Sequence, residues 1–339
     1  MDNGSSRLWD EMLEEFRALG GTVENVRLGQ GPLGRGLFVI DPGRPFLVRI
    51  PESLLVNVSD IVFENGVLKV AAGANVGARE RKFYEDYYTH ISWGGGGRRE
   101  IERIFEQAAE LPPELRHKLF AKYICGEWFY EPSPGLIQKG FIDSREIVFQ
   151  DRKVMMPIIE LANHGPICSY DDEDASLSLK GSAENEITVQ YASIDTLGMF
   201  VSWGFVAECD TAFSFALQGA LGITSLHVGR HTVNTTMGIR PVPPTLTKIE
   251  DGVLGLNYLM LGNRRLPRLC RGNFRSVMHA AGYTDVDETF DRIRMLNQGH
   301  FLGLLGDLEE LDGPMVRQLR RMARLQLLAL TYCFGARVL

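Results

Sequence analysis

Apolar and polar positions along the chain follow two different periods. Residues 7–20 place apolar side chains one helical turn apart and stop at two glycines, which predicts a helix that ends there. Residues 37–40 and 46–50 are short apolar runs on either side of a Pro-Gly turn sequence at 41–44. We therefore expect an N-terminal helix followed by a β-hairpin.

The pattern becomes mainly helical from about residue 61 to residue 150. Tyr84, Tyr87 and Tyr88 recur at helical spacing, and a second apolar stripe covers residues 101–111. This predicts a helical insertion between two β regions. We interpret the tyrosines first as helix-packing core and second as the border of a substrate groove.

A glycine-rich segment, Trp93-Gly94-Gly95-Gly96-Gly97-Arg98-Arg99, separates the two helical stretches. Backbone N–H groups of such a segment can cradle an anion. However, the Lys-Ser/Thr pair and the preceding strand of a phosphate loop are both missing. We therefore expect a flexible linker.

Residues 154–164 are apolar over most of their length and then end in polar groups. The short run is typical of a buried strand or extended segment, and Pro157 argues against a central, fully paired strand. Glu160, Asn163 and His164 are costly to bury without hydrogen bonds, so the fold or a ligand must supply partners. Taken alone, an Asn-His pair in such a place is most often structural.

Further short strands are expected downstream, at residues 176–179 and 187–191. Ile187, Val189 and Tyr191 share one face of the second strand, so Tyr191 is expected to point inward with two apolar side chains. The acidic residues 171–174 lack the spacing of a calcium-binding loop and are interpreted as a solvated turn.

The C-terminal part begins with a mixed stretch and becomes helical. The Pro-rich residues 240–244 predict a domain linker. In the last helix, Arg317, Arg320, Arg321 and Arg324 fall largely on one side. That side is interpreted first as a solvated face and second as a surface for an acidic partner.

Composition narrows the class of protein. The net charge of -7 over 339 residues argues against broad nucleic-acid binding. The five scattered cysteines form no C-x-x-C pair, so neither a zinc site nor a disulfide framework is expected. The N-terminus lacks a signal-peptide pattern, and no run of about 18 apolar residues is present. We expect a soluble, cytoplasmic protein that binds no metal, nucleic acid or membrane.

Four short motifs occur in a definite order. They are Gly34-Arg35-Gly36-Leu37-Phe38-Val39, Ser144-Arg145, the Asn163-His164 pair, and Ile187-Thr188-Val189-Gln190-Tyr191 followed by Trp203-Gly204-Phe205-Val206. The first motif is not a dinucleotide-binding fingerprint, because the third glycine and the following helix are missing. In this order and at these separations the motifs resemble the SET-domain methyltransferases. The branch concerned contains the Rubisco large-subunit lysine methyltransferase and the actin-histidine methyltransferase, and the resemblance covers about residues 27–210.

The resemblance implies an α+β fold. It consists of a β-rich SET core in which the Asn-His and Tyr segments cross in a pseudoknot, a helical insertion, and a mostly helical C-terminal domain. The expected divisions are the N-terminal helix and first half of the core at 1–60, the insertion at 61–150, the second half of the core at 151–210, and a substrate-binding domain at 211–339.

The resemblance also assigns site residues for the cofactor S-adenosylmethionine. The backbone of Gly34, Arg35, Gly36 and Leu37 would line its methionine part. Arg145 would meet the carboxylate, a group that suits the forked guanidinium. Asn163 and the main chain of His164 would hold the amino group and adenine, with Phe205 packing nearby.

The remaining implied roles concern the acceptor, a protein with an exposed lysine. Tyr191 would lie where the donor methyl and the acceptor nitrogen meet, as an orienting hydroxyl rather than a base, because its pKa near 10 keeps it protonated. Ile147, Glu160 and Trp203 would border the substrate channel, and the apolar Ile147 favours lysine over histidine. Gly165 and Trp203 depart from the residues common in the family. The alternatives are a histidine methyltransferase and a catalytically silent SET module that binds a protein partner.

Overall fold

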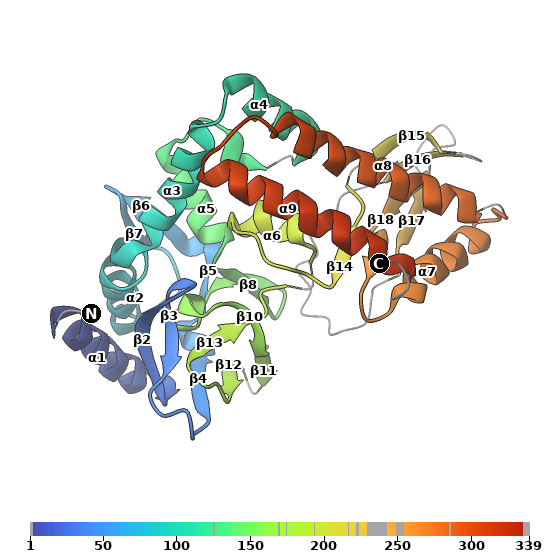
Figure 1. Ribbon diagram of the computed structural model, residues 1–339. Helices are drawn as coiled ribbons and strands as arrows, with labels where there is room; N and C mark the ends of the chain where they lie inside the picture. The colour runs from blue at the N-terminus through green and yellow to red at the C-terminus, as the bar shows by residue number, and fades with distance from the viewer. Residues whose placement is uncertain are drawn as a thin grey trace. The chain divides into compact units, whose positions relative to one another are not determined.

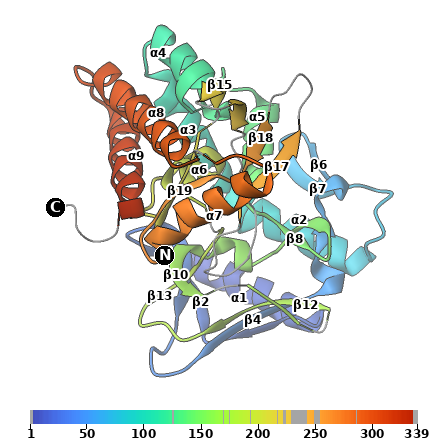
Figure 2. The ribbon, with the colours of Figure 1, turned by 90° about the vertical axis from the view of Figure 1, so that its right-hand side faces the viewer.

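Helices and strands are mixed throughout the chain, as expected for the α+β class (Figures 1 and 2). The computed structural model describes residues 3–334 apart from Cys125, Ser169, Asp174, Ser193, Ala216, 222–223, 229–242, 249–253 and Asp285. These residues form two compact units. Unit 1 comprises Met1–Glu102 and Ser133–Tyr191, and unit 2 comprises Arg103–Pro132 and Ala192–Leu339.

Unit 1 contains short strands in four sheets, with helices between them. Its helices are α1 (Asn3–Ala18), α2 (Ala78–His90) and α5 (Pro134–Asp143). Its strands are β1 (Thr22–Glu24), β2 (Val26–Gly31), β3 (Gly34–Val39), β4 (Phe46–Pro51), β5 (Val56–Asn57), β6 (Ile61–Glu64), β7 (Val67–Val70), β8 (Glu146–Phe149), β9 (Arg152–Met155), β10 (Asn163–Cys168), β11 (Asp171–Glu173), β12 (Ser176–Gly181) and β13 (Glu186–Val189). The sheet orders are β1-β4-β12-β11, β10-β13-β3-β2, β5-β9-β8 and β6-β7.

The sheet β10-β13-β3-β2 places three of the sequence motifs side by side. Strand β10, which begins at Asn163, pairs in parallel with β13, the strand that leads to Tyr191. Strand β13 in turn pairs antiparallel with β3, which carries Gly34, Gly36 and Leu37. Segments that are more than 100 residues apart in the sequence therefore lie on adjacent strands.

The expected strands at 37–40 and 46–50 are present, but the expected hairpin between them is wrong. Strand β3 pairs with β2 and β13, while β4 pairs with β1 and β12. Each strand therefore has both edges occupied by other partners. The connection between them is held by Asn25, whose Nδ2 donates to the carbonyl oxygens of Asp41 (2.8 Å) and Arg44 (2.9 Å).

The tyrosines of α2 pack in the core of unit 1, which confirms the first interpretation. Tyr84, Tyr87 and Tyr88 are fully buried. The Tyr84 hydroxyl lies against the carbonyl of Leu54 and also donates to the carbonyl of Met155, at 3.1 Å. These side chains therefore fasten the segment that leads to Glu160 rather than border an open groove.

Unit 2 contains more helix than unit 1. Its helices are α4 (Pro113–Lys118), α6 (Thr196–Trp203), α7 (Pro267–Ala280), α8 (Val286–Asp307) and α9 (Pro314–Thr331), together with most of α3 (Arg98–Ala109). Its strands are β14 (Thr211–Phe213), β15 (Leu217–Leu221), β16 (Thr224–Val228), β17 (Thr245–Lys248), β18 (Leu254–Asn257) and β19 (Met260–Asn263). Three long helices end the described chain, as expected. The strands β17 to β19, which precede these helices, were not expected.

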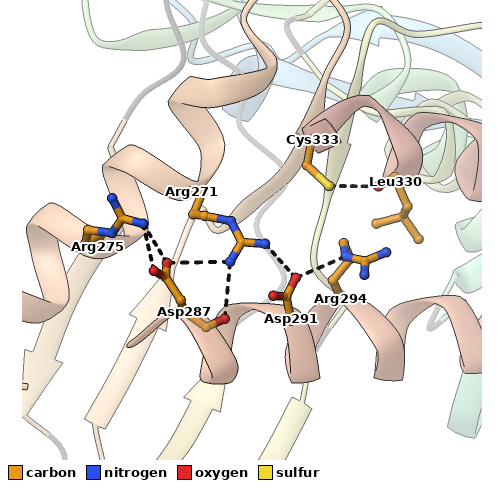
Figure 3. Close-up of polar contacts among 7 residues, drawn as sticks. All are labelled: Arg271, Arg275, Asp287, Asp291, Arg294, Leu330 and Cys333. Atoms are coloured by element: carbon orange, nitrogen blue, oxygen red, sulfur yellow. Dashed lines mark hydrogen bonds and ion pairs between the residues drawn. The ribbon is translucent and has the colours of Figure 1, made fainter. Parts of the chain in front are cut away.

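Helices α7 and α8 are joined by an ionic cluster (Figure 3). Arg271 donates to Asp291 at 2.6 Å, and Arg275 donates to Asp287 at 2.7 Å. Most of these groups are partly exposed, so each pair contributes about 0–1 kcal/mol. The cluster mainly fixes the register of the two helices.

The arginine side of α9 is partly structural. Arg320 donates to the carbonyl oxygens of Leu308 and Leu311, at 2.6 and 2.8 Å, and so caps the end of α8. Arg321 and Arg324 are exposed. The expected Pro-rich linker falls mainly on residues 240–242, which lie outside the described residues.

Candidate functional site

Two of the predicted motifs meet where Asn163 reaches strand β3. The Asn163 amide donates through Nδ2 to the Arg35 carbonyl (3.3 Å) and to Oε1 of Glu186 (2.7 Å). A Cβ atom added to Gly36 would lie only 2.5 Å from Nδ2. Glycine at position 36 is therefore required by this close approach. Gly34 is required for another reason, since its φ is +105°.

Tyr191 lies beside the same segment. Its hydroxyl donates to the Ala162 carbonyl at 2.8 Å, and its backbone N–H donates to Nδ1 of His164 at 3.3 Å. Burial lowers the pKa of His164 to about 4, so the imidazole is neutral at pH 7 and Nδ1 can accept a hydrogen bond. Burial raises the pKa of Tyr191, which keeps the phenol protonated. A hydroxyl in this state can orient a reactant but is a poor base.

A second set of side chains in unit 1 surrounds Arg145, whose own side chain is 13% exposed. Its Nη1 donates to Ser144 Oγ at 2.8 Å, and its Nη2 donates to Glu100 at 3.0 Å. Its guanidinium also stacks over Phe141, 4.3 Å from the ring centroid. The fourth neighbour is Glu160, whose Oε2 lies 3.8 Å from Nε.

Glu160 is a fully buried carboxyl group. Burial raises its pKa, and the charge of Arg145 opposes that rise. The Ser92 and Tyr87 hydroxyls lie near enough to oppose it too, although neither is aligned as a hydrogen bond to the carboxylate. The buried carboxyl group of Glu160 therefore lacks the hydrogen bonds that normally accompany burial.

Several polar atoms around this pair have no hydrogen-bond partner within the described residues. They are Nε of Arg145, both carboxylate oxygens of Glu160, Ser92 Oγ and the Tyr88 hydroxyl. Each buried and unpaired polar group costs about 1–3 kcal/mol. A cluster that joins a cation, an anion and hydroxyls is suited to a ligand that carries both charges.

The backbone before Glu160 is strained. Ile158 has φ 70° and ψ -58°, and Ile159 N–H donates to the Pro157 carbonyl at 2.9 Å, which together form a γ-turn of the rare positive-φ kind. Such a conformation costs about 1–3 kcal/mol in a β-branched residue. The Tyr87 hydroxyl accepts from the Ile158 N–H at 2.8 Å and so helps to hold the turn. The expectation that this stretch is not one paired strand is confirmed, because strand β9 ends before the turn.

The glycine-rich segment is an ordered turn, so the expected flexible linker is wrong. It forms a π-helical turn over Trp93–Gly97 that leads into α3. A Cβ on Gly94 would lie 1.9 Å from the Thr89 carbonyl oxygen. Cβ atoms on Gly95 and Gly97 would lie 2.7 Å from Arg35 Nη1 and 3.3 Å from Arg145 Nη2. Glycine thus lets this turn approach the heads of both arginines.

A pocket of about 360 Å³ is lined in part by this turn. Arg98 and Arg99 line it, but both pair with Glu102, at 2.7 and 3.7 Å. The two cations therefore share one carboxylate, which leaves a single net positive charge among the three side chains. The geometry gives no specific support to the alternative that this segment cradles an anion.

Gly165, a departure from the resembled family, has a local explanation. A Cβ at this position would lie 2.3 Å from Oγ1 of Thr188 on the paired strand β13. The larger residue common in the family would displace Thr188. Gly165 therefore keeps β10 close to β13.

The other predicted residues are distributed over both units. Leu37 is fully buried on β3, and Ile147 is half-buried on β8, opposite Val154 of β9. Trp203 and Phe205 belong to unit 2, at the end of α6, and both are half-buried. The roles of Ile147, Trp203 and Phe205 stay predictions.

Sequence reasoning missed several residues of this site. The sequence motifs assign a role to the backbone of Arg35 but none to its side chain. They do not point to Ser92, Glu100 or Glu186 at all. Glu186 directly precedes the Ile187–Tyr191 motif, so of these residues it was the easiest to predict from the sequence. The other three become neighbours only through folding.

Membrane-spanning helices and clusters of metal-binding side chains are both absent from the described part of the chain. None of its helices is long and apolar enough to cross a membrane. No group of three or more His, Cys, Asp or Glu side chains that could hold a metal ion occurs among the residues with described positions.

Comparisons with known proteins give limited information. No protein-family model matches the chain, and no curated protein matches it. Among solved structures, the chain is similar to a crystal structure of the SET domain of LSMT bound to lysine and AdoHcy, with 12% sequence identity. That similarity covers 97% of this chain and 90% of the other, with a TM-score of 0.43.

Proposed function

We propose that this protein is an S-adenosylmethionine-dependent protein methyltransferase of the SET type, which transfers a methyl group to a lysine side chain. The observation that carries the proposal is the meeting of three motifs in unit 1. Asn163 contacts the backbone at Arg35 and Gly36, and Tyr191 bonds to Ala162, one residue before Asn163. The resembled family uses these motifs in the same order.

The chain's own residues fit the cofactor's polar groups. Arg145 has a buried Nε that makes no hydrogen bond and offers a guanidinium for the carboxylate. Asn163 uses Nδ2 within the protein, which leaves Oδ1 as the amide's acceptor for an amino group. Gly36 admits close backbone approach on the same side. When bound, S-adenosylmethionine supplies an electrophilic methyl group on a sulfonium.

The acceptor must lose a proton before it can react. A lysine amine has a reference pKa near 10.4, so deprotonation at pH 7 costs about 4–5 kcal/mol. Burial lowers the pKa of an amine by disfavouring the ammonium form. Tyr191 stays protonated and contributes by orienting the acceptor nitrogen, since its hydroxyl is already fixed by the Ala162 carbonyl. In this proposal the site positions the reactants and supplies no side-chain base.

The preference for lysine rests on Ile147. It lies on β8, and its aliphatic side chain suits the methylene arm of lysine better than a polar imidazole, which needs a hydrogen-bonding neighbour. Mass spectrometry of the methylated protein identifies the acceptor residue. Methylhistidine in place of methyllysine would replace this part of the proposal with the histidine alternative.

The proposal is tested by incubating the protein with methyl-labelled S-adenosylmethionine and a cell lysate. We expect at least one labelled protein band. Arg145→Ala should raise the Kd for the cofactor about tenfold or more, because a charge-assisted contact is lost. Cofactor binding without any labelled band would contradict the proposed activity.

A second candidate function is a SET-like module that binds a protein partner without catalysis. The contact between Arg145 and Glu100 favours it, because this carboxylate occupies the outer side of the guanidinium that the cofactor would use. Calorimetry separates the two functions. A binding module would give no heat with S-adenosylmethionine or with its demethylated product, whereas an enzyme would bind both.

A further inference from the structure

Helix α8 of unit 2 carries an exposed apolar stripe. One face of this helix is buried in the core of unit 2, where it packs beside α9 (Figure 1). On the opposite side, Met295 is 64% exposed and Leu302 is 58% exposed. Exposed apolar side chains that gather on one helix face can mark an interaction surface.

Large and small residues alternate along this stripe. Met295, Gly299, Leu302 and Gly306 follow one another at intervals of four, three and four residues, which places them on one helix face. Both glycines are exposed, and a Cβ added to either would meet nothing within 4 Å. The face therefore presents two projections, the side chains of Met295 and Leu302. Next to them are two open notches, at Gly299 and Gly306, where no side chain fills the space.

Charges stand at the two ends of the same face. Arg292 lies one turn before Met295, and Glu309 follows Gly306 just after the helix ends. Both residues are exposed. They are separated by about 25 Å along the helix, at 1.5 Å per residue, so they do not pair with each other within one chain.

We propose that this face of α8 is the contact surface for a second copy of the same chain. Two α8 helices that cross antiparallel, with a twofold axis between residues 300 and 301, bring each projection to a notch. Leu302 then faces Gly299 of the second copy, and Met295 faces Gly306 of the second copy. Arg292 meets Glu309 of the second copy, and by symmetry this charge pair forms twice.

A second copy fits this face better than an unrelated partner does. A single register of the two antiparallel helices produces all three pairs at once. It places Leu302 opposite Gly299, Met295 opposite Gly306, and Arg292 opposite Glu309. A face that complements itself in shape and in charge meets the condition for an isologous dimer. One helix pair buries less than the roughly 800 Å² per partner of a stable complex, so we expect a Kd of about 10–100 µM.

Sedimentation velocity of the full chain, from about 1 to 500 µM, tests the proposal. The wild type should shift from monomer to dimer across that range. Gly299→Leu fills a notch that has free space within its own chain, so it should fold normally and raise the dimer Kd at least tenfold. Ile40→Arg is the matched control, because Ile40 is as exposed as Met295, at 64%, but lies in unit 1.

Charge reversal identifies the partner surface. Arg292→Glu and Glu309→Arg should each raise the dimer Kd about tenfold, and the double variant should return it close to the wild-type value. Because the two residues are too far apart to pair in one chain, such a rescue requires contact between copies. A wild type that stays monomeric to 500 µM, or a double variant without rescue, would overturn the proposal.

Discussion

At the scale of single residues, the candidate site depends on titratable groups held in unfavourable surroundings. Glu160 is fully buried beside Arg145, and burial raises its pKa. His164 is held neutral, because burial lowers its pKa to about 4. Each group reduces the free energy of unfolding at some pH. A binding site commonly retains such groups at a cost in stability.

The neutral state of His164 predicts a pH dependence of stability. Its folded pKa of about 4 lies below the unfolded value of 6.5, so the unfolded chain binds more protons between these values. The contribution of His164 to the free energy of unfolding is greatest above pH 6.5. It decreases by roughly 3 kcal/mol as the pH falls through 4. Urea unfolding at pH 7 and pH 4 measures it. His164→Asn keeps an acceptor near the position of Nδ1 and should flatten this slope. An unchanged slope would assign the pH dependence to other groups.

The sequence predicted those site residues whose polarity stands out locally. Asn163 and His164 end an apolar run, and Tyr191 shares a face with apolar neighbours, so each is conspicuous in its own segment. Ser92 and Glu100 belong to no motif along the chain and become notable only when folding brings them to Glu160 and Arg145. Sequence periodicity describes one segment at a time and cannot reveal such encounters.

At the scale of elements, the glycine-rich turn shows how composition alone misleads. Four consecutive glycines predicted flexibility, because glycine adds backbone freedom to an unfolded chain. In the folded protein the same residues allow a close passage, since the turn lies against the Thr89 carbonyl and the heads of Arg35 and Arg145. The missing Cβ atoms therefore serve packing, and the turn is part of the site.

We expect the turn to tolerate no side chain at Gly94. Gly94→Ala would put a Cβ 1.9 Å from the Thr89 carbonyl oxygen, so the backbone must shift. We expect a cost of about 3 kcal/mol or more, and a melting temperature lower by about 5–10 °C. Gly73→Ala is the matched control, because a Cβ there meets nothing within 4 Å. Differential scanning calorimetry compares the two variants, and equal melting temperatures would restore the linker interpretation.

Strand positions were more predictable than strand pairing. The apolar runs at 37–40 and 46–50 do form β3 and β4, but neither is the other's neighbour. The Pro-Gly sequence between them indicates a turn correctly without determining which edges pair. Pairing is decided by distant strands, such as β12 and β13, that compete for the same edges.

At the scale of the whole molecule, the chain forms two compact units, and most of the residues predicted for the site belong to unit 1. The glycines of β3, Arg145, Asn163 and Tyr191 belong to unit 1, whereas Trp203 and Phe205 belong to unit 2. The site's described hydrogen bonds and ion pairs all occur within unit 1. The four divisions expected from the sequence stay a prediction.

Cofactor binding should therefore protect unit 1 selectively from hydrogen exchange. A free ligand concentration of 100 times Kd stabilises the state that binds the ligand by about 2.7 kcal/mol. Hydrogen exchange through local opening of the binding site then slows about 100-fold. We expect this protection with S-adenosylmethionine in β3, β10 and β13. Peptides from α7 and α8 of unit 2 provide the internal comparison. Equal protection everywhere would indicate that the cofactor binds elsewhere or acts only through global stability.

The most direct test of the account is methyl transfer by Tyr191→Phe. The substitution removes a hydroxyl that donates to the Ala162 carbonyl and keeps the ring, so cofactor Kd should stay within about twofold while kcat falls about 100-fold or more. Tyr84→Phe is the control, since it removes a buried hydroxyl that serves the core. It should lower the melting temperature and leave kcat unchanged. Transfer by Tyr191→Phe at the wild-type rate, measured with labelled S-adenosylmethionine and the same acceptor, would contradict the proposed site.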